Sequence, residues 1–588
     1  MKFSPGDRRL VICFAALLAA RYLWARLDDL ERLLLSAVAP DVLGPGGMAL
    51  VLFPAGLIAI GWRLLRVRGW GRLEAALASG SLGLVVGTGT LRFMLIGQVG
   101  RLPSPAAPAW LLLALAGCFL VMLALARLAA RHPWPALGVF AGAYALTLSA
   151  LSWFEWSRGN SFDTVIFTQS LWNTLHGNLM WNSIEGANHL RVHFSPLLLA
   201  FVPGYALWPD GRLLLAGQGV AVAGAALPLF ALLTGRPEQR RLDPTTALLV
   251  TAGLLLSAGV LCPTAAQFHE MTFAPVLFLG AVAFLERRRP WGFALCCLGL
   301  LAVKEIMGPV VMLFALPAWR RHYGWAWVFL PVLAGVLWTG CALAWLMGGH
   351  GADQPDYFSF AYQHLGHSLP AKVHTVLGRP GYMWDHLRSR PNTDYLAGLL
   401  WPYGWVVPWT AGWSIFALPH LLANTASKAL YNYLILLRYW HATLILAALS
   451  LAFGRSLARW QRQEMAGAAG ARWVAMMALA ATLWVTAPWL TLTLGEAASR
   501  EDAARQRRIA ALIPPRATVQ APQSLLQWVG NRPFTWPMPQ DRFDHRPDCI
   551  WRIVPDLHPM PEGYRLAVRE GRYELWQREA GGRPLPAR

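Results

Sequence analysis

Charged residues are scarce in this sequence. They make up 14% of its 588 residues, against about 25% in a typical soluble protein, while hydrophobic residues make up 56%. This balance excludes an intrinsically disordered chain, collagen and a small disulfide scaffold, and it argues strongly against a soluble enzyme. The long apolar runs instead predict an all-α polytopic membrane protein, because such runs are solvated by lipid.

Lysine and cysteine are also rare. Lys2, Lys304, Lys372 and Lys428 are the lysines among 51 basic residues, and the arginines lie in short loops between apolar runs. The net charge of +20 therefore follows membrane topology rather than one basic patch, and we expect no nucleic-acid binding. The seven cysteines form no CxxC pair, which leaves structural zinc and a disulfide framework without support.

Apolar runs near the ~20 residues that cross a bilayer recur along the chain. They predict about fifteen transmembrane helices, namely one at the N-terminus and others near 46–65, 74–95, 108–127, 135–153, 212–234, 245–262, 271–286, 291–304, 306–319, 324–346, 394–408, 410–424, 440–454 and 471–493. Arginine clusters on alternate loops place the N-terminus in the cytoplasm and the C-terminus outside. A cleaved signal peptide is the alternative for the first run, although no A-x-A site follows it.

Four long segments lie on the predicted outer side, at 155–195, 263–270, 348–392 and from 494 onward. Residues 155–195 mix ionisable and large aromatic residues, which indicates a folded cleft wall; a well-packed connecting loop is the alternative. Residues 494–588 contain a predicted strand at 517–521, a helix at 522–530 and strands near 549–553, 563–569 and 572–577. We therefore expect extra N-terminal helices at 1–134, a transmembrane domain at 135–493 and a small C-terminal α/β extracytoplasmic domain.

Short motifs in the outer segments resemble a known family. The densest runs from Asp163 to Gly177 (DTVIFTQSLWNTLHG), and the others are Ile184-Glu185-Gly186, Asn188-His189, His193 to Pro196, Phe268-His269-Glu270, Lys304-Glu305, Tyr439-Trp440-His441, Ile513-Pro514-Pro515 and Asn531-Arg532. They resemble a membrane-protein family of unknown function, numbered 2079. That family in turn resembles the GT-C glycosyltransferases. This resemblance implies a GT-C-like membrane fold, a polyprenyl-phosphate-linked sugar donor and a catalytic acid in the first outer loop.

The sequence departs from that family pattern in two places. Thr168 stands where the family has a second Asp, which argues against a paired-carboxylate site. The chain also has extra N-terminal residues, enough for about four helices, which suggests a regulatory or partner-binding addition or simply lipid packing.

Asp163 is the candidate catalytic residue. A lipid-linked donor keeps its phosphate at the membrane surface and its sugar just outside, so a general base must lie at headgroup depth. Asp163 follows the predicted helix at 135–153 closely enough to fit this requirement. The alternative is that Asp163 caps a helix at 164–175, since Asp is a favoured N-cap residue.

Other residues are candidates for binding the donor. Lys304 and Arg438 are the cations expected near the phosphate. Their alternatives are a buried ion pair with Glu305 or Glu270 for Lys304 and an interfacial anchor for Arg438. The remaining candidates for substrate binding are Glu185, Asn188, His189, His193, His269, Glu270 and His441. No cofactor is certain: Glu185, His189 and His193 admit a divalent metal, but the sequence has no HExxH motif.

These observations favour a glycosyltransferase of the bacterial inner membrane. It would move a sugar from a polyprenyl-phosphate donor to an extracytoplasmic acceptor whose identity the sequence leaves open, with membrane lipid as its other partner. A transporter or flippase for lipid-linked sugars is the rival, although no internal repeat is evident. A non-catalytic binder of such lipids is the third hypothesis, and Thr168 keeps it open.

Overall fold

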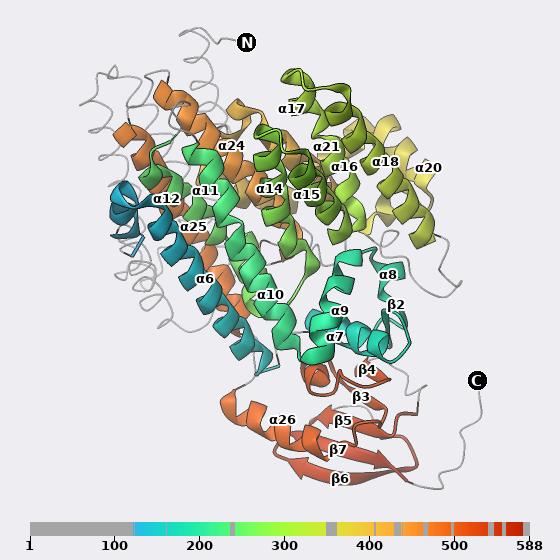
Figure 1. Cartoon of the computed structure of the whole chain (residues 1–588). Coiled ribbons are helices and arrows are strands. Elements are labelled where there is room, and N and C mark those ends of the chain that lie inside the picture. The colour runs from blue at the N-terminus through green and yellow to red at the C-terminus, as the bar shows by residue number, and fades with distance from the viewer. Residues whose placement is uncertain are drawn as a thin grey trace, which may run out of the picture.

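The computed structural model describes most of the chain from residue 121 to residue 579. The exceptions within that range are 123, 160–161, 236–241, 348–360, 405–406, 428–436, 438, 463–467, 496–498, 539–545 and 555–559. The described part is mostly helical, with a small C-terminal sheet (Figure 1). The first helices predicted from the sequence, and most of the segment 1–134, lie outside the described residues.

Four helices of the described part are long and apolar enough to cross a bilayer. They are α6 (Pro133–Trp156), Gly211–Thr234 comprising α10 (Gly211–Gly224) and α11 (Ala226–Thr234), Trp325–Leu346 within α18 (Trp325–Met347), and Trp440–Arg462 comprising η11 (Trp440–Ala442) and α24 (Thr443–Arg462). A fifth is the pair α12 (Pro244–Leu255) and α13 (Ala258–Ala266), which is bent by 50°. These spans coincide with predicted ones, but the structure does not confirm a total of about fifteen.

Several other predicted spans are short or interrupted. The hairpin of α14 (Ala274–Glu286) and α15 (Pro290–Val303) has helices of 13 and 14 residues. The run 306–319 divides into η5 (Glu305–Met307), α16 (Gly308–Met312) and α17 (Ala315–Arg320). The run 394–424 divides into α22 (Arg390–Leu400), η7 (Trp401–Tyr403), η8 (Val407–Ala411), η9 (Trp413–Ala417) and α23 (Leu418–Ala426). Continuous spans were wrong there because proline removes backbone donors and clashes with the preceding turn. Gly404 and Gly412, which have positive φ, end two of the short turns.

The helices differ in how deeply they lie in the bundle. Of the span at Trp440–Arg462, 89% is buried, against 17% of the span at Trp325–Leu346. The first is therefore a central helix, and the second presents most of its apolar surface outward, as a lipid-facing helix does. Close packing depends on small residues: a Cβ on Gly219 of α10 would lie 2.7 Å from Oγ of Ser149 on α6.

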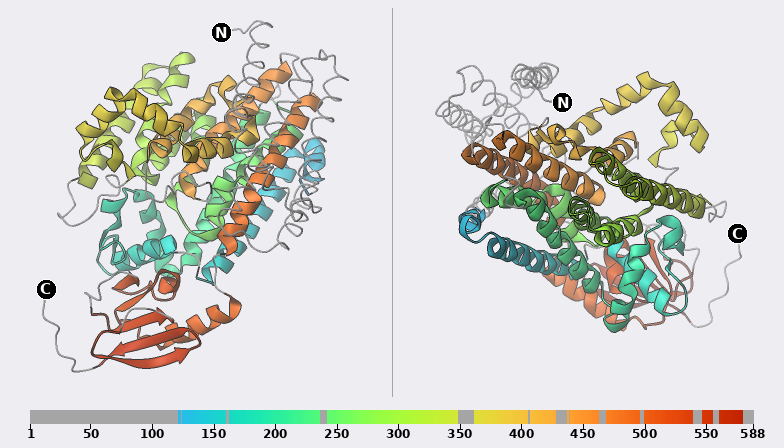
Figure 2. Two further views of the ribbon diagram at one scale, coloured as in Figure 1. Left: turned by 180° about the vertical axis from the view of Figure 1, so that it is seen from behind. Right: turned by 45° about the horizontal axis from the view of Figure 1, so that its top comes forward.

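The first outer segment folds into short elements between the bundle and the sheet. It contains α7 (Phe162–Leu175), β1 (Trp181–Asn182), β2 (Ala187–Asn188), α8 (His189–Val192), η2 (Pro196–Phe201) and α9 (Val202–Leu207). Figure 1 and the left view of Figure 2 both place these elements between the helices and the C-terminal strands. The predicted helix at 164–175 is confirmed with a start at Phe162, and residues 196–207 form a short helical stretch.

The C-terminal region follows α25 (Ala468–Gly495) with α26 (Arg500–Leu512) and a five-stranded sheet. The strand order is β4-β3-β5-β7-β6, from β3 (Val519–Pro522), β4 (Thr535–Met538), β5 (Cys549–Ile553), β6 (Tyr564–Glu570) and β7 (Tyr573–Arg578). The β6–β7 hairpin turns at Gly571, as its sequence predicts. The predicted helix at 522–530 is the 3-10 turn η12 (Gln523–Trp528), whereas β4 and α26 were not predicted.

Candidate functional site

Asp163 lies in the first turn of α7, at the junction between the bundle and the outer segment. Its backbone N–H donates to Oε1 of Gln267 at 3.3 Å, and its side chain is partly exposed. Among the residues that the structure describes, its carboxylate accepts no hydrogen bond and forms no ion pair, so the capping alternative finds no hydrogen bond to support it. Burial, followed by the charges of Glu270 and Glu185, raises the pKa of Asp163 to about 7.

Glu185 and His189 form a pair that faces Asp163. Nδ1 of His189 lies 2.9 Å from Oε2 of Glu185, and Nδ2 of Asn182 donates to the same oxygen at 2.7 Å. Burial alone would raise the pKa of Glu185 and lower that of His189, but the attraction between the two reverses both shifts. Nε2 of His189 is buried without a hydrogen-bond partner among the described residues. This ring is thus oriented by a carboxylate and retains an unused nitrogen.

His193 and Asn188 have different roles from His189. Nδ1 of His193 lies 3.3 Å from Oε1 of Glu305, and the other oxygen of Glu305 accepts from the Phe194 N–H at 3.0 Å. These contacts fasten the outer segment to the break after α15. Asn188 caps α8 by accepting from the Leu190 N–H, and its amide donates to the Leu179 carbonyl. Asn188 therefore helps to hold the loop, and its role in substrate binding stays a prediction.

Lys304 pairs with Glu270 inside the protein. Nζ of Lys304 lies 3.0 Å from Oε1 of Glu270, Nδ1 of His269 lies 3.2 Å from Oε2, and all three side chains are buried. Of the two alternatives for Lys304, the ion pair with Glu270 is therefore the one that forms. A buried pair of this kind is expensive to desolvate, which makes it weak evidence for stability and a reason to expect function.

Gln218 of α10 holds the turn that carries His269. Its Oε1 accepts from the His269 N–H at 2.8 Å, and its Nε2 donates to the carbonyl oxygens of Thr264 and Gln267. We did not predict Gln218 or Gln267 as site residues. A glutamine inside an apolar run is itself an indicator of a functional site in a membrane protein, so this signal was present in the sequence.

Trp440 adds an aromatic contact to the cluster. The ring of His269 stacks on Trp440 with centroids 3.7 Å apart, and Trp440 adjoins His441. Asn424 of α23 donates to the His441 carbonyl at 3.2 Å. Arg438 lies outside the described residues. His420, also on α23, is buried near these residues and was not predicted.

The described residues provide no metal site. They contain no group of three or more His, Cys, Asp or Glu side chains placed to hold an ion. His189 and His193 each approach a different carboxylate, and their ring centroids are 6.0 Å apart. A divalent metal on Glu185, His189 and His193 therefore gains no support from the geometry.

The C-terminal region braces α7 from the outer side. Gln169 donates through Nε2 to the Arg532 carbonyl at 3.1 Å and to Oγ of Ser183 at 3.0 Å. Oγ of Ser183 in turn lies 2.7 Å from both the carbonyl oxygen and the backbone nitrogen of Thr535. These bonds fix the helix that carries Asp163 between the bundle and the sheet. Thr168, at the place of the family's second Asp, is buried and donates to the Val165 carbonyl.

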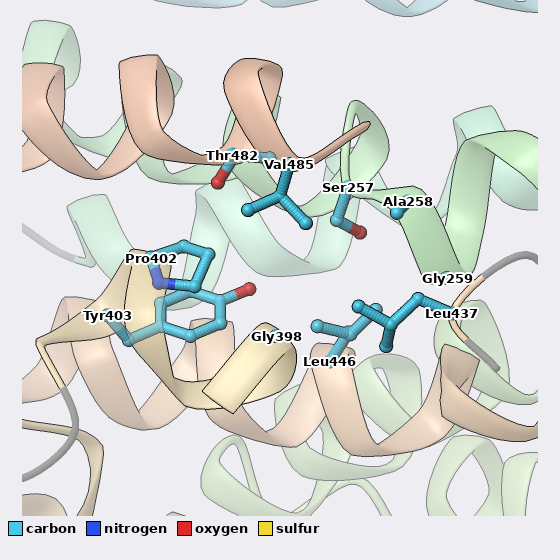
Figure 3. Close-up of a pocket in the computed structure, with 10 residues that line it drawn as sticks. All are labelled: Ser257, Ala258, Gly259, Gly398, Pro402, Tyr403, Leu437, Leu446, Thr482 and Val485. Atoms are coloured by element: carbon cyan, nitrogen blue, oxygen red, sulfur yellow. The ribbon is translucent and has the colours of Figure 1, made fainter. Parts of the chain in front are cut away.

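A small pocket lies elsewhere in the bundle, at the bend between α12 and α13 (Figure 3). Its lining residues are mostly apolar and include Ser257, Ala258, Gly259, Gly398, Pro402, Tyr403, Leu437, Leu446, Thr482 and Val485. The Tyr403 hydroxyl lies 2.8 Å from Oγ of Ser450. None of the predicted site residues lines this pocket, so the chemistry is expected at the Asp163 cluster instead.

Comparison with known proteins identifies one family. The family model described as predicted membrane protein (DUF2079) matches residues 158–555. Two solved structures of ArnT from Cupriavidus metallidurans are similar at 14% identity. The one bound to undecaprenyl phosphate has a TM-score of 0.41 and covers 75% of this chain and 98% of its own; the apo one has a TM-score of 0.38 and covers 74% and 98%. No curated protein sequence matches the chain.

Proposed function

This chain belongs to the family of predicted membrane proteins designated DUF2079, and we propose that it is an integral-membrane glycosyltransferase of GT-C type. It transfers a sugar from a polyprenyl-phosphate donor to a hydroxyl group of an acceptor outside the bacterial plasma membrane. The N-terminus then lies in the cytoplasm and the C-terminal sheet outside. The observation that carries the proposal is the Asp163 carboxylate, which is partly exposed and has an elevated pKa beside two ionisable pairs.

Asp163 is the general base in this proposal. The acceptor oxygen bonds to the anomeric carbon of the sugar as the bond from that carbon to the phosphate oxygen breaks. Asp163 takes the hydroxyl proton, and the polyprenyl phosphate leaves with the bonding electrons. A base works best when its pKa lies near the working pH, and a pKa of about 7 meets that condition.

The neighbouring pairs supply the other functions. Lys304 stabilises the leaving phosphate, and Glu270 holds the ammonium group in place at 3.0 Å. His189, oriented by Glu185, offers its unused Nε2 to a sugar hydroxyl. Preorganised groups of this kind lower the barrier because they need not reorient during the reaction.

The test is sugar transfer by the Asp163→Asn variant in proteoliposomes with a labelled polyprenyl-phosphate sugar. The matched control is Asp385→Asn, because Asp385 is an exposed residue that forms a surface ion pair with Arg388. Loss of transfer in the first variant and normal transfer in the second support the proposal. Normal turnover by a folded Asp163→Asn protein removes the base. Movement of labelled lipid across the bilayer without transfer favours the transporter hypothesis instead.

A further inference from the structure

His420 is a buried polar side chain that the proposed mechanism does not use. It is 2% exposed, and neither ring nitrogen has a hydrogen-bond partner among the described residues. Leaving buried donors and acceptors unsatisfied costs free energy, so native proteins rarely do so without a ligand or a functional reason. His420 therefore requires an explanation beyond packing.

The ring belongs to the same cluster as Lys304. His420 and Asn424 are four residues apart on α23 and share a helix face, and Asn424 reaches the His441 carbonyl on η11. Trp440 of η11 stacks on His269, whose neighbour Glu270 pairs with Lys304. Electrostatic interactions join Lys304 to both His420 and His441. Four separate segments of the chain thus contribute to this cluster, at His420, Trp440, His269–Glu270 and Lys304.

Trp440 contributes a second unsatisfied group. Its indole Nε1 is buried and has no hydrogen-bond partner in the described part of the chain, although the ring is fixed by its stack on His269. An indole nitrogen can only donate a hydrogen bond, and a neutral imidazole donates through one nitrogen. The cluster therefore presents neutral N–H donors beside one ammonium group.

We propose that His420 and Trp440, together with Lys304, form a subsite for the phosphate group of a lipid. This inference rests on the proposed function and deepens it, because it assigns the residues that hold the donor's leaving group. Phosphate oxygens are strong acceptors, and neutral N–H donors satisfy them without adding charge to the interior. Glu270 already balances Lys304, so the subsite suits a single phosphate group better than a more highly charged diphosphate.

The experiment measures binding rather than turnover. Full-length protein in nanodiscs is titrated with undecaprenyl phosphate, with undecaprenol, which lacks the phosphate, and with inorganic phosphate. We expect His420→Leu to weaken binding of undecaprenyl phosphate at least tenfold and to leave undecaprenol binding unchanged. His420→Gln, which keeps a donor, recovers part of the affinity. His374→Leu is the matched control, since His374 lies exposed on α20 (Leu369–Gly378).

A second variant tests the subsite independently in case His420→Leu fails to fold. Trp440→Phe removes the N–H group and keeps an aromatic ring against His269, and it should weaken undecaprenyl phosphate binding about threefold with an unchanged melting temperature. Equal weakening of phosphate and alcohol, or wild-type affinity in both variants, overturns the proposal. Tight binding of inorganic phosphate alone shows that free phosphate is the ligand and overturns the lipid assignment.

The two proposals fail separately. If Asp163→Asn retains transfer while His420→Leu loses phosphate binding, the subsite stands and the proposed base is wrong. If Asp163→Asn abolishes transfer while His420→Leu binds undecaprenyl phosphate normally, the base stands and the subsite is wrong.

Discussion

Glu574 in the C-terminal sheet and Asp163 at the junction are carboxylates with opposite surroundings. In the sheet, Glu574 is fully buried and its oxygens accept from Arg552, Arg569 and the Trp576 indole. Burial alone would raise the pKa of Glu574, but these hydrogen bonds lower it. At the junction, burial and like charge raise the pKa of Asp163 to about 7.

The difference shows that a carboxylate can serve the architecture of the protein or its chemistry. Glu574 has as many donors as its oxygens need, so its charge contributes to the architecture of the sheet. The cluster around Asp163 keeps polar atoms of His189 and His420 without hydrogen-bond partners among the described residues. A protein tolerates such an arrangement where a ligand completes it, and this is why we place the chemistry at the junction.

The largest effects, and the most direct test of this difference, are expected when each carboxylate is neutralised in turn. Asp163→Asn should lower the transfer rate about 10²–10⁴-fold, the usual contribution of a general base. The folded-state pKa of Asp163 exceeds its ordinary value of 3.8, so the fold loses stability as the pH rises from about 4 to about 7, and the loss stays constant above that range. At pH 8 this variant should therefore melt about 2 °C higher, as followed by thermal unfolding in detergent.

Glu574→Gln should have the opposite effects, namely lower stability and an unchanged transfer rate. It removes the negative charge that accepts from Arg552 and Arg569 and should cost about 2 kcal/mol of stability, with normal transfer per folded molecule. A Glu574→Gln protein with full stability, or an Asp163→Asn protein that unfolds at a lower temperature, would contradict the division between the two sites.

The next largest effect is expected where the C-terminal sheet braces α7. Ser183→Ala removes the hydroxyl that lies 2.7 Å from the Thr535 backbone and leaves buried groups unpaired, so we expect a loss of about 2 kcal/mol and about tenfold slower transfer. Ser157→Ala is the control, because that hydroxyl donates to the nearby Phe154 carbonyl in an exposed turn. Unchanged transfer in Ser183→Ala would show that the sheet is not needed to position Asp163.

The pH dependence sharpens the assignment of the base. Asp163 must be ionised to accept a proton, so kcat/KM should rise tenfold per pH unit below about 7 and level off above it. The pKa of Glu185 is lowered, and its ionisation is therefore complete before this range. A rate that stays constant from pH 6 to pH 8 argues against Asp163 as the base.

Asn188 should show the smallest effect. Asn188→Ala removes the cap of α8 and should cost about 1 kcal/mol of stability, while KM for the donor changes less than threefold. A tenfold increase in KM measured in the same assay would support the predicted role of Asn188 in substrate binding.

Local patterns predicted much of this fold. The hairpin of β6 and β7 follows from alternating side chains around Gly571, and α7 follows from an apolar helical period after Asp163. Runs rich in proline misled the prediction, because their hydropathy resembles that of a span while their backbone cannot form one helix. Hydropathy alone therefore overestimated the number of continuous helices.

Pairing across the chain was not predictable from one sequence. Lys304 lay next to Glu305 in the sequence, yet it pairs with Glu270, and Glu305 instead reaches His193, 112 residues away. Which acid meets which base depends on helix packing, and no local period records it. The residue types of the cluster were thus recognisable, while its partners, together with His420 and Trp440, required coordinates.

Ser183 and Thr535 are 352 residues apart in the chain. During synthesis the loop that carries Asp163 emerges early, and the strand that secures it emerges near the end of translation. A nascent or prematurely terminated chain would therefore hold its acidic residue loosely while lipid is already within reach. If the chain is the proposed transferase, we therefore expect C-terminal truncation to abolish transfer even when every membrane helix has inserted.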